Sequence, residues 1–361
     1  MTDEEYMKLA LEEAVKGMGY TSPNPMVGAV IVKDGRILSR DYHHRCGEFH
    51  AERNAINKCI YNMKGAEIYV TLEPCCHYGK TPPCTQAIID SGIKKVYIGS
   101  DDPNPLVAGK GVRILREHGI EVKTGVLKDE CDRINEVFFH YIMHKTPFVV
   151  MKYAMTADGK TACFNGESKW ISGKASRENT HHDRMRYTGI MVGVGTVIAD
   201  DSQLTCRLEN GRNPVRIICD SRLRTPLNSF IVKTAHEIPT VIACLEGAEN
   251  VQAYENAGVK IVCVPEKDGH VDLAELMKKL GEMKIDSILL EGGSQLNYSA
   301  LKAGIVNKVQ AYIAPKIFGG ASAFSPVGGH GVSSPDECFM LEKPKIRCLG
   351  DDFLIEWEVK S

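Results

Sequence analysis

The sequence lacks any block of Lys and Arg, and it has no continuous apolar run long enough to cross a bilayer. Its 361 residues carry 44 Lys and Arg against 46 Asp and Glu, which leaves a formal net charge of −2. Proteins that follow a phosphate backbone need a dense basic surface, so we exclude nucleic acid as the main partner. The acidic start of the chain does not resemble a secretion signal, and we expect neither export nor membrane association.

The sequence also lacks internal repeats and low-complexity tracts, and its thirteen cysteines are an odd number spread along the whole chain. Without an export signal this pattern does not indicate a disulfide framework, and we expect a reducing, cytoplasmic setting. The length exceeds what one hydrophobic core usually serves, and 43% hydrophobic residues are enough for two cores. We therefore expect two domains and a small-molecule partner.

The domain boundary is predicted where a long helix ends. Residues 127–144 place apolar side chains at helical spacing, which indicates one helix with a packing face. Residues 145–147 then break the helix, and a new strand follows. We expect domains at residues 1–146 and 147–361. Helices alternate with strands in both, which predicts α/β folds and an α/β/α sandwich for the first domain.

A candidate metal site lies in the first half. The nitrogen ligand His50 and the sulfur ligands Cys75 and Cys84 suit Zn²⁺. Three protein ligands leave the fourth tetrahedral position for water, as a catalytic site requires. Zn²⁺ lowers the pKa of such a water towards neutrality, and Glu52 would then move protons from the water to a departing amine.

A purely structural zinc site is the alternative, because a fourth protein ligand would close the coordination sphere. Cys76 and His77 are the residues that could supply that ligand. His43, His44 and Glu48 precede the predicted metal helix and could line a pocket, although no metal spacing selects them.

The pattern His-x-Glu at residues 50–52, followed by Pro-Cys at residues 74–75, resembles the zinc deaminases of nucleobases and nucleotides. The longer form Glu-Pro-Cys-x-His-x-Gly-x-Thr-Pro-Pro-Cys at residues 73–84 resembles the deaminase half of the bifunctional riboflavin-biosynthesis deaminase/reductase family, with Cys76 in place of the usual Ser. The resemblance implies a cytidine-deaminase-like fold and a substrate-facing Asn24, for which an ordinary Asx turn is the alternative.

Glycine-containing turns follow two apolar strands of the second half, at residues 193–195 and 292–293, and a helix is predicted to start at Ser294. Glycine allows close backbone approach and a helix N-terminus attracts anions, so these turns could hold phosphates. Ordinary strand-end turns are the alternative, and the common dinucleotide fingerprint is not met because Ile198 occupies the position of its third glycine. Residues 263–272 look like an ordinary connection.

Residues 152–160, 166–171 and 204–207 resemble the reductase half of the same family, whose fold is similar to dihydrofolate reductase, so the resemblance covers nearly the whole chain. It implies contacts to NADPH from Ala154, Trp170, Thr196, Asp200, Ser221, Gly293, Ser294, Gln295, Leu296, Asn297, Tyr298 and Ser299. It implies contacts to substrate from Ser168, Arg184, Leu204, Arg207 and Glu291.

Some of these implied contacts have independent physical sense. Arg184 and Arg207 are permanently charged and fork-shaped, which suits a phosphorylated sugar, whereas a solvated surface charge is the alternative. Lys152, Asp158 and Lys160 could contact a polar group of the substrate or could pair with each other.

We therefore expect a bifunctional enzyme of riboflavin synthesis. Zinc-dependent hydrolysis would deaminate a phosphorylated pyrimidine, a diaminopyrimidine ribosylamine 5′-phosphate, and NADPH would then reduce its ribosyl group to ribityl. Arg222 and Arg224, close to Ser221, could favour NADPH over NADH. One alternative is a deaminase of another nucleoside or of tRNA with a non-catalytic binding domain, and another is a zinc-stabilised binding module without activity. We also expect a homo-oligomer, because such enzymes often assemble.

Overall fold

The computed structural model describes residues 1–78, 82–104 and 107–360. The chain divides into two compact units, Met1–Lys145 and Thr146–Ser361, one residue before the boundary expected from the sequence. Gly79 and Thr81 of the cysteine-loop motif lie outside the described residues. No helix in the described part of the chain combines the length and the apolarity that crossing a membrane requires.

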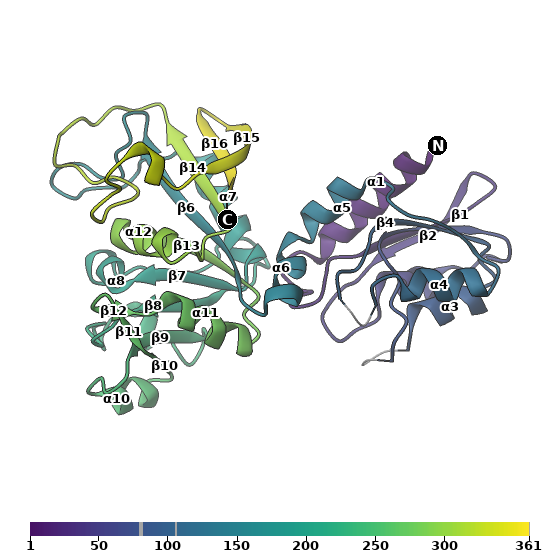
Figure 1. The fold of residues 1–361 in the computed structure, drawn as a ribbon, viewed down its shortest axis with the longest axis horizontal. Helices are drawn as coiled ribbons and strands as arrows, with labels where there is room; N and C mark the ends of the chain where they lie inside the picture. The colour runs from purple at the N-terminus through teal and green to yellow at the C-terminus, as the bar shows by residue number, and fades with distance from the viewer. Residues whose placement is uncertain (79–81, 105–106, 361) are drawn as a thin grey trace. The chain divides into compact units, whose positions relative to one another are not determined.

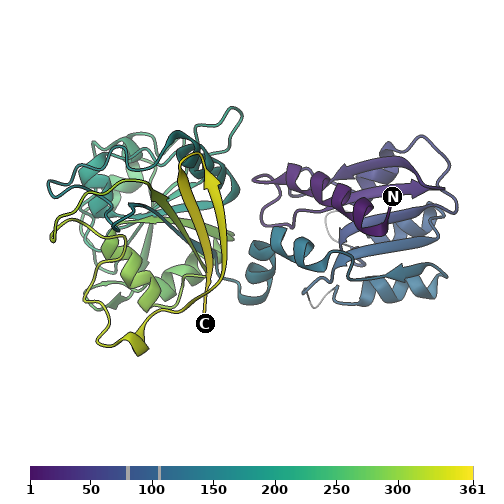
Figure 2. The ribbon, with the colours of Figure 1, turned by 90° about the horizontal axis from the view of Figure 1, so that it is seen from above.

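The first unit contains a five-stranded sheet with helices on both faces (Figures 1 and 2). The strand order is β2-β1-β3-β4-β5, in which β1 is antiparallel to both neighbours and β3, β4 and β5 run parallel. The strands are β1 (Gly28–Lys33), β2 (Arg36–Tyr42), β3 (Glu67–Leu72), β4 (Lys95–Ser100) and β5 (Glu121–Lys123). The helices are α1 (Asp3–Ala14), the short 3-10 helix η1 (Val15–Gly17), α2 (Ala51–Lys58), α3 (Cys84–Asp90), α4 (Lys110–Glu117), α5 (Lys128–Ile134) and α6 (Glu136–His144).

The pleat of β1 divides the core of this unit between two faces, because successive side chains of a strand point in opposite directions. Ile31 belongs to the cluster that includes residues of α2, α3 and α4, whereas Val30 belongs to the cluster that includes residues of α1 and α5. Both side chains are fully buried. The expected α/β/α sandwich is therefore confirmed.

The prediction of a single helix over residues 127–144 is wrong. Asn135, with φ −108° and ψ 15°, separates α5 from α6. The side-chain amide of Asn135 accepts a hydrogen bond from the Met26 N–H (2.8 Å) and donates one to the Met26 carbonyl (2.9 Å). Asn side chains compete with helical hydrogen bonds by bonding to backbone groups in this way. The pairing fixes the segment before β1 against the start of α6.

The second unit is built on a nine-stranded sheet with the order β10-β9-β8-β7-β13-β6-β14-β16-β15. The first seven strands in this order run parallel, and β16 and β15 add antiparallel pairs at one edge. The strands are β6 (Phe148–Thr156), β7 (Gly189–Gly193), β8 (Val215–Cys219), β9 (Thr240–Leu245), β10 (Lys260–Val264), β13 (Ser287–Gly292), β14 (Lys308–Ala314), β15 (Leu341–Leu349) and β16 (Asp352–Val359). The helices are α7 (Lys174–Arg186), α8 (Val194–Asp200), α9 (Phe230–Lys233), α10 (Val251–Asn256), α11 (Leu273–Glu282), α12 (Ser294–Lys302) and the 3-10 helix η2 (Pro335–Glu337).

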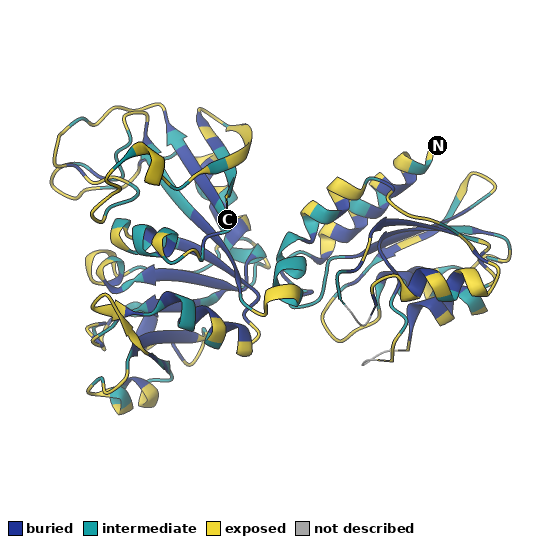
Figure 3. Cartoon of the chain, in the orientation of Figure 1, coloured by how far each residue is buried: buried dark blue, intermediate teal, exposed yellow. Residues whose placement is uncertain are grey.

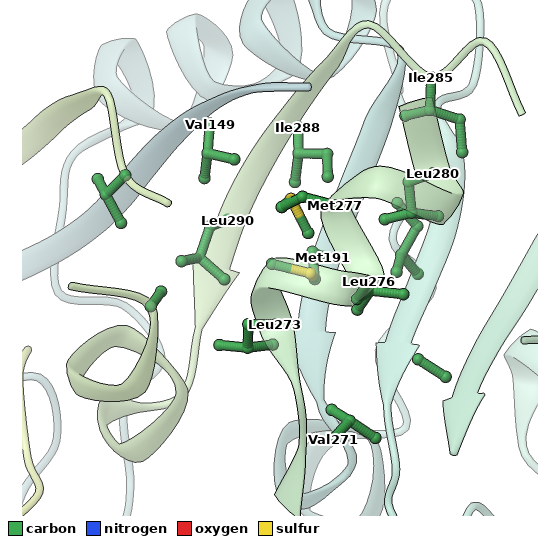
Figure 4. Packing of buried hydrophobic residues seen from close by; sticks show 14 of the residues in the cluster. Val149, Met191, Val271, Leu273, Leu276, Met277, Leu280, Ile285, Ile288 and Leu290 are labelled. Carbon is green, nitrogen blue, oxygen red and sulfur yellow. The ribbon is translucent and has the colours of Figure 1, made fainter. Parts of the chain in front are cut away.

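Amphipathic helices cover the sheet of the second unit. In the cluster of Figure 4, Met191 of β7 and Leu290 of β13 pack with Leu273, Leu276 and Leu280 of α11. The spacing of three, four and seven residues along α11 places these leucines on one stripe. A second cluster joins the sheet to α8, α9 and α10. Figure 3 shows that the inner strands of the sheet are buried, that the edge strand β15 is exposed, and that the helices are exposed on their outer sides.

The expectation of an ordinary connection at residues 263–272 is wrong. Cys263 still belongs to β10, and the strands β11 (Glu266–Lys267) and β12 (His270–Val271) form an antiparallel hairpin. The N–H of Val271 donates a hydrogen bond to the Ser221 hydroxyl (3.2 Å), which ties the hairpin to the turn after β8.

The neighbouring parallel strands β7 and β13 both end in glycine; α8 begins directly after β7, and α12 begins after one further glycine, Gly293. In open α/β sheets, ligands bind outside the carboxyl ends of parallel strands. The topology therefore brings the two glycine turns of the sequence together at one edge of the sheet.

Candidate active sites

The three predicted metal ligands of the first unit lie together. His50 is the N-cap residue of α2, Cys84 is the first residue of α3, and Cys75 lies in the loop after β3. His50 Nδ1 lies 3.5 Å from the Sγ atom of Cys75 and 3.5 Å from that of Cys84. A tetrahedral Zn²⁺ with bonds of about 2.3 Å to sulfur and about 2.0 Å to nitrogen requires an N···S separation of about 3.5 Å. The donor set therefore fits zinc in both chemistry and spacing.

In the described part of the chain, no fourth protein ligand joins this cluster. Among the described residues, the ligand atoms that lie within 4.8 Å of one another belong to His50, Cys75 and Cys84, and neither Cys76 nor His77 is included. Hydrogen bonding from Cys84 and the nearby His50 place the pKa of Cys75 well below its usual range despite burial, whereas burial raises the pKa of Cys76. Because the Sγ atom of Cys75 belongs to the cluster and that of Cys76 does not, the geometry favours Cys75 over Cys76 as the ligand.

Glu52 lies beside the cluster in the first turn of α2, and only 3% of its surface is exposed. Burial raises the pKa of Glu52 to about 7, and the nearby Cys75 acts in the same direction. A carboxyl group with a pKa near neutrality can both take up and release a proton at physiological pH. Glu52 lines the same cavity as His50 and Cys75, so it can exchange protons with a molecule bound there.

This cavity, of about 360 Å³, also contains the predicted Asn24 together with His43 and Glu48. The buried His43 donates its Nδ1–H to the Phe49 carbonyl (3.0 Å), so its Nε2 accepts from the Asn24 amide (3.2 Å). Burial lowers the pKa of His43, which favours this neutral tautomer. The pairing fixes the Asn24 amide at the cavity wall. His44 instead pairs with Asp41 at 2.8 Å, away from the lining.

Sequence reasoning missed one wall of this cavity. Phe138, Tyr141 and Ile142 of α6 line it, although their helical spacing suggested a packing face. No residue of α6 is fully buried. Asp102 also lines the cavity, and burial raises its pKa to about 6. Helical spacing alone does not distinguish a core face from a cavity wall, and the Asn at position 135 was the available signal that the helix changes direction.

The second unit contains two adjoining cavities. The arginine cavity, of about 540 Å³, is lined by residues that include Arg184 and Arg207, and the glycine cavity, of about 640 Å³, by residues that include Gly193 and Gly195. The lining residues that the two cavities share are Thr161, Ser168, Thr196, Asp200, Gly293 and Ser294. Two ligands bound side by side would therefore meet at these residues.

The residues predicted to contact NADPH divide between the cavities. The glycine cavity is lined by Thr196, Asp200, Ser221, Gly293, Ser294, Gln295, Leu296 and Ser299. The arginine cavity is lined by Ala154, Trp170 and Asn297. Tyr298 lines neither cavity, because α12 turns its ring towards Gly329 and its hydroxyl donates to the Gly331 carbonyl (2.9 Å). The contact between Tyr298 and NADPH stays a prediction.

The turn before α12 suits a phosphate-bearing cofactor. Gly292 and Gly293 have φ +67° and +94°, values that disfavour any residue with a Cβ atom. A Cβ at Gly292 would lie 2.3 Å from Asn297 Oδ1, whereas a Cβ at Gly195 would meet nothing within 4 Å. The backbone at Gly195 can therefore be approached closely, and the first N–H groups of α12 are oriented for an anion.

All the residues predicted to contact substrate in this unit, which are Ser168, Arg184, Leu204, Arg207 and Glu291, line the arginine cavity. Arg184 donates from Nε to Glu291 Oε1 (2.7 Å), from Nη2 to Glu291 Oε2 (2.9 Å) and from Nη1 to the Thr205 carbonyl (2.9 Å). Three N–H donors of Arg184 are therefore engaged within the chain, and its contact with the substrate stays a prediction. Of the two arginines, Arg207 is exposed and Arg184 is half-buried.

The mutual pairing considered for Lys152, Asp158 and Lys160 does not occur among the described residues. Lys152 lines the arginine cavity, and burial lowers its pKa although the nearby Glu291 opposes this change. Asp158 accepts a hydrogen bond from the Gly319 N–H (2.7 Å) and does not line the cavity. Lys152 is therefore the member of this group that remains a candidate for substrate contact.

Comparison with known proteins agrees with this division. Residues 1–100 match the family described as the cytidine and deoxycytidylate deaminase zinc-binding region, and residues 147–355 match the RibD C-terminal domain. The fold and the sites thus define a zinc-binding deaminase domain joined to a reductase domain. The deaminase domain indicates Zn²⁺, and the reductase domain indicates a nicotinamide cofactor.

Full-length relatives share both domains. The riboflavin biosynthesis protein RibD of Actinobacillus pleuropneumoniae is 52% identical to this chain, and the match covers 100% of this chain and 96% of that protein. RibD of Escherichia coli K12 is 38% identical, and the match covers 88% of this chain and 89% of that protein. Among solved structures, RibD of Acinetobacter baumannii superposes with a TM-score of 0.88 at 33% identity, covering 99% of each chain. The deaminase/reductase of Thermotoga maritima gives 0.87 at 40% identity, also over 99% of each.

The chain belongs to the RibD family, and it is a bifunctional deaminase and reductase of riboflavin biosynthesis. The expected fold class and enzyme class are confirmed. The alternative of a nucleoside or tRNA deaminase with a non-catalytic binding domain is not favoured, because the relatives cover both halves of the chain.

Proposed function

We propose that the first unit deaminates a diaminopyrimidine ribosylamine 5′-phosphate, and that the second unit then reduces its ribosyl group to ribityl with NADPH. The single observation that carries the proposal is the presence of two complete sites in one chain. One is a three-ligand zinc cluster that opens into a cavity beside Glu52, and the other is the pair of adjoining cavities of the reductase domain.

In the deaminase step, Glu52 takes a proton from the attacking water and delivers it to the departing ammonia. When bound to His50, Cys75 and Cys84, Zn²⁺ supplies the Lewis acidity that makes water a nucleophile near neutral pH. Asn24, fixed by His43, orients the pyrimidine so that its amine-bearing carbon faces the cluster. The water adds to that carbon, the C–N bond breaks, and no covalent link to the protein forms.

In the reductase step, the arginine cavity holds the phosphorylated substrate and the glycine cavity holds the cofactor. When bound, NADPH would supply a hydride to C1 of the opened sugar, and a proton from solvent would complete the gain of two hydrogens. We assign the substrate phosphate to Arg207 and Lys152, which line this cavity together with Arg177, while the Arg184–Glu291 pair shapes the wall. Thr196 and Asp200 line both cavities, which supports a meeting of the reacting carbon and the cofactor beside them.

The preference for NADPH over NADH is assigned to Arg224. Of the two arginines considered, Arg224 lines the glycine cavity and Arg222 does not. The turn that carries Arg224 is well supported, because the Asp220 carboxylate accepts hydrogen bonds from the N–H and the hydroxyl of Thr225, both at 2.7 Å. His270 of β12 lines the same cavity, so two basic side chains are available to the extra phosphate of NADPH.

Titration of protein fluorescence with NADPH and NADH tests this assignment. Arg224→Ala is expected to weaken NADPH binding about ten- to hundredfold, as for the loss of a hydrogen bond to a charged group, and to leave NADH binding unchanged. Arg222→Ala is the matched control and is expected to behave as wild type. Equal weakening of both cofactors by Arg224→Ala would contradict a role in reading the phosphate.

The order of the two steps is tested with enzyme from which zinc has been removed by a chelator. Such enzyme is expected to oxidise NADPH when the deaminated intermediate is supplied, and to leave NADPH unchanged when the diaminopyrimidine is supplied. Oxidation with the diaminopyrimidine would show that reduction does not depend on prior deamination, and the proposed order would be wrong.

A cytoplasmic location and a homo-oligomer remain part of the proposal. All thirteen cysteines are free thiols, as a reducing compartment maintains them. Sedimentation equilibrium is expected to give the mass of two or more chains. The mass of a single chain would contradict assembly.

A further inference from the structure

Glu73, directly before Pro74 and Cys75, is buried although it is a carboxylate that does not ligate the predicted metal. Its Oε2 atom accepts a hydrogen bond from the Gly109 N–H at 2.9 Å, and its Oε1 atom accepts one from the Val112 N–H at 3.2 Å. Gly109 is the N-cap residue of α4. Both oxygens of Glu73 are therefore used by the first turn of a helix that lies more than thirty residues further along the chain.

The first turn of α4 also rests directly on the backbone of the cysteine loop. A Cβ atom added at Gly111 would lie 2.3 Å from the Pro74 carbonyl oxygen and 3.1 Å from Glu73 Oε1. Real Cβ atoms do not approach backbone oxygen so closely, so the contact requires glycine. Glu73 and Gly111 thus fit α4 against the residue that precedes Cys75.

We infer that Glu73 is a positioning residue for the zinc site, one that sets the place of Cys75 by holding the loop against the N-terminus of α4. The inference rests on the proposed zinc site. The exposed backbone N–H groups and the positive end of the helix dipole favour a carboxylate at this point. Two N–H donors need two acceptor oxygens, which Glu provides and Gln does not.

The same contact reaches the substrate cavity of the first unit. Asn104 and Val107 line that cavity, and Val107 lies two residues before Gly109. Fixing Gly109 therefore fixes one end of a cavity wall as well as one end of the zinc loop. A single carboxylate links the metal ligand Cys75 to the wall that the pyrimidine contacts.

Zinc affinity, measured by competition with a chromogenic chelator, tests the inference. Glu73→Gln is expected to weaken zinc binding about ten- to hundredfold, the range typical for residues that support metal ligands, while reductase activity on the deaminated intermediate stays unchanged. Glu5→Gln is the matched control, because Glu5 also caps a helix of this unit, through the Thr2 N–H (2.7 Å), but lies away from the zinc site. Glu5→Gln is expected to bind zinc as wild type does.

Gly111→Ala separates positioning from general stability. Because the added Cβ would crowd the Pro74 carbonyl oxygen, a purely structural role predicts a zinc-free protein of lower stability whose zinc affinity, once folded, equals that of wild type. The inference predicts zinc binding about tenfold weaker or more, because the added Cβ displaces Pro74 and with it Cys75.

Wild-type zinc affinity in Glu73→Gln or in Gly111→Ala would overturn the inference. If Glu73→Gln does not fold, Gly111→Ala still decides the question. A wild-type protein that binds no zinc would overturn the proposed deaminase function instead, so the two failures are distinguishable.

Discussion

Arg184 and Glu291 meet through two parallel hydrogen bonds, from Nε to Oε1 at 2.7 Å and from Nη2 to Oε2 at 2.9 Å, in the wall of the arginine cavity. About one eighth of each side chain is exposed, at 13% and 12%. The pair joins α7 to the end of β13, two elements that shape the reductase site. In this geometry the guanidinium of Arg184 holds the carboxylate of Glu291 in place.

Glu291→Gln is predicted to destabilise the second unit by about 3–5 kcal/mol at neutral pH, because it leaves Arg184 buried without its partner. Both tryptophans, Trp170 and Trp357, lie in this unit, so urea unfolding followed by tryptophan fluorescence reports on it. Glu358→Gln, which breaks the exposed pair with Lys343, is the control and is expected to cost less than about 1 kcal/mol. An equal loss of stability in the two variants would contradict the predicted contribution of the buried Arg184–Glu291 pair.

The contribution of Glu291 is also predicted to depend on pH. Burial acts to raise the pKa of Glu291, but the charges of Arg184 and Lys152 outweigh it and lower the pKa to about 2. Since an unfolded Glu titrates near about 4.3, the stabilisation is complete above that pH and is lost as the pH falls towards about 2. The difference in unfolding free energy between wild type and Glu291→Gln should therefore shrink across this window. A difference that stays constant would show that the pKa is not lowered.

Glu52→Gln is predicted to reduce deaminase activity about 10²- to 10⁴-fold, because Gln cannot carry the proton from water to ammonia. Zinc content, measured by atomic absorption, and reductase activity on the deaminated intermediate are both expected to match wild type. A variant that deaminates at the wild-type rate would exclude Glu52 as the proton carrier.

Cys75→Ser and Cys84→Ser are predicted to lose both the bound zinc, from about one ion per chain to near none, and deaminase activity. Cys76→Ser is the matched control, because Cys76 lies next to Cys75 but outside the cluster. It is expected to keep zinc and activity. Loss of zinc in Cys76→Ser, with zinc retained in Cys75→Ser, would show that Cys76 and not Cys75 is the zinc ligand.

Asn135→Ala is predicted to destabilise the first unit, because the N–H and the carbonyl of Met26 lose their partner at about 1–3 kcal/mol for each group left unpaired. The KM of the deaminase is also expected to rise, since α6 lines the cavity. Asn307→Ala, which removes the acceptor for the Val149 N–H in the second unit, is the control. Unfolding followed by circular dichroism measures the stability, and deaminase kinetics measure the KM. An unchanged KM would show that Asn135 does not affect substrate binding through α6.

Much of the fold could be predicted from the sequence, because the hydrophobic periods of the elements are clear. The alternation of helices and strands was enough for the sandwich of the first unit, and the residues of the zinc cluster were recognisable by type and spacing. The break at Asn135 was not predicted, because it depends on a partner 109 residues away, and helical spacing continues across it.

The reductase site was less predictable for the same reason. The engagement of Arg184 on α7 depends on Glu291, which is 107 residues away on strand β13. Tyr298 was included because it follows Ser294 in the chain, but rotation along α12 carries it away from both cavities. A motif identifies which segment reaches a site, whereas the helix period and the tertiary contacts decide which side chains enter it.

The most direct test of the central claim is mass spectrometry of the diaminopyrimidine ribosylamine phosphate after incubation with zinc-loaded protein, once with NADPH and once without. Replacement of an amine by oxygen without NADPH, followed by a gain of two hydrogens when NADPH is present, is the predicted result. An unchanged substrate mass in both incubations would contradict the account, and deamination without later reduction would contradict its second half.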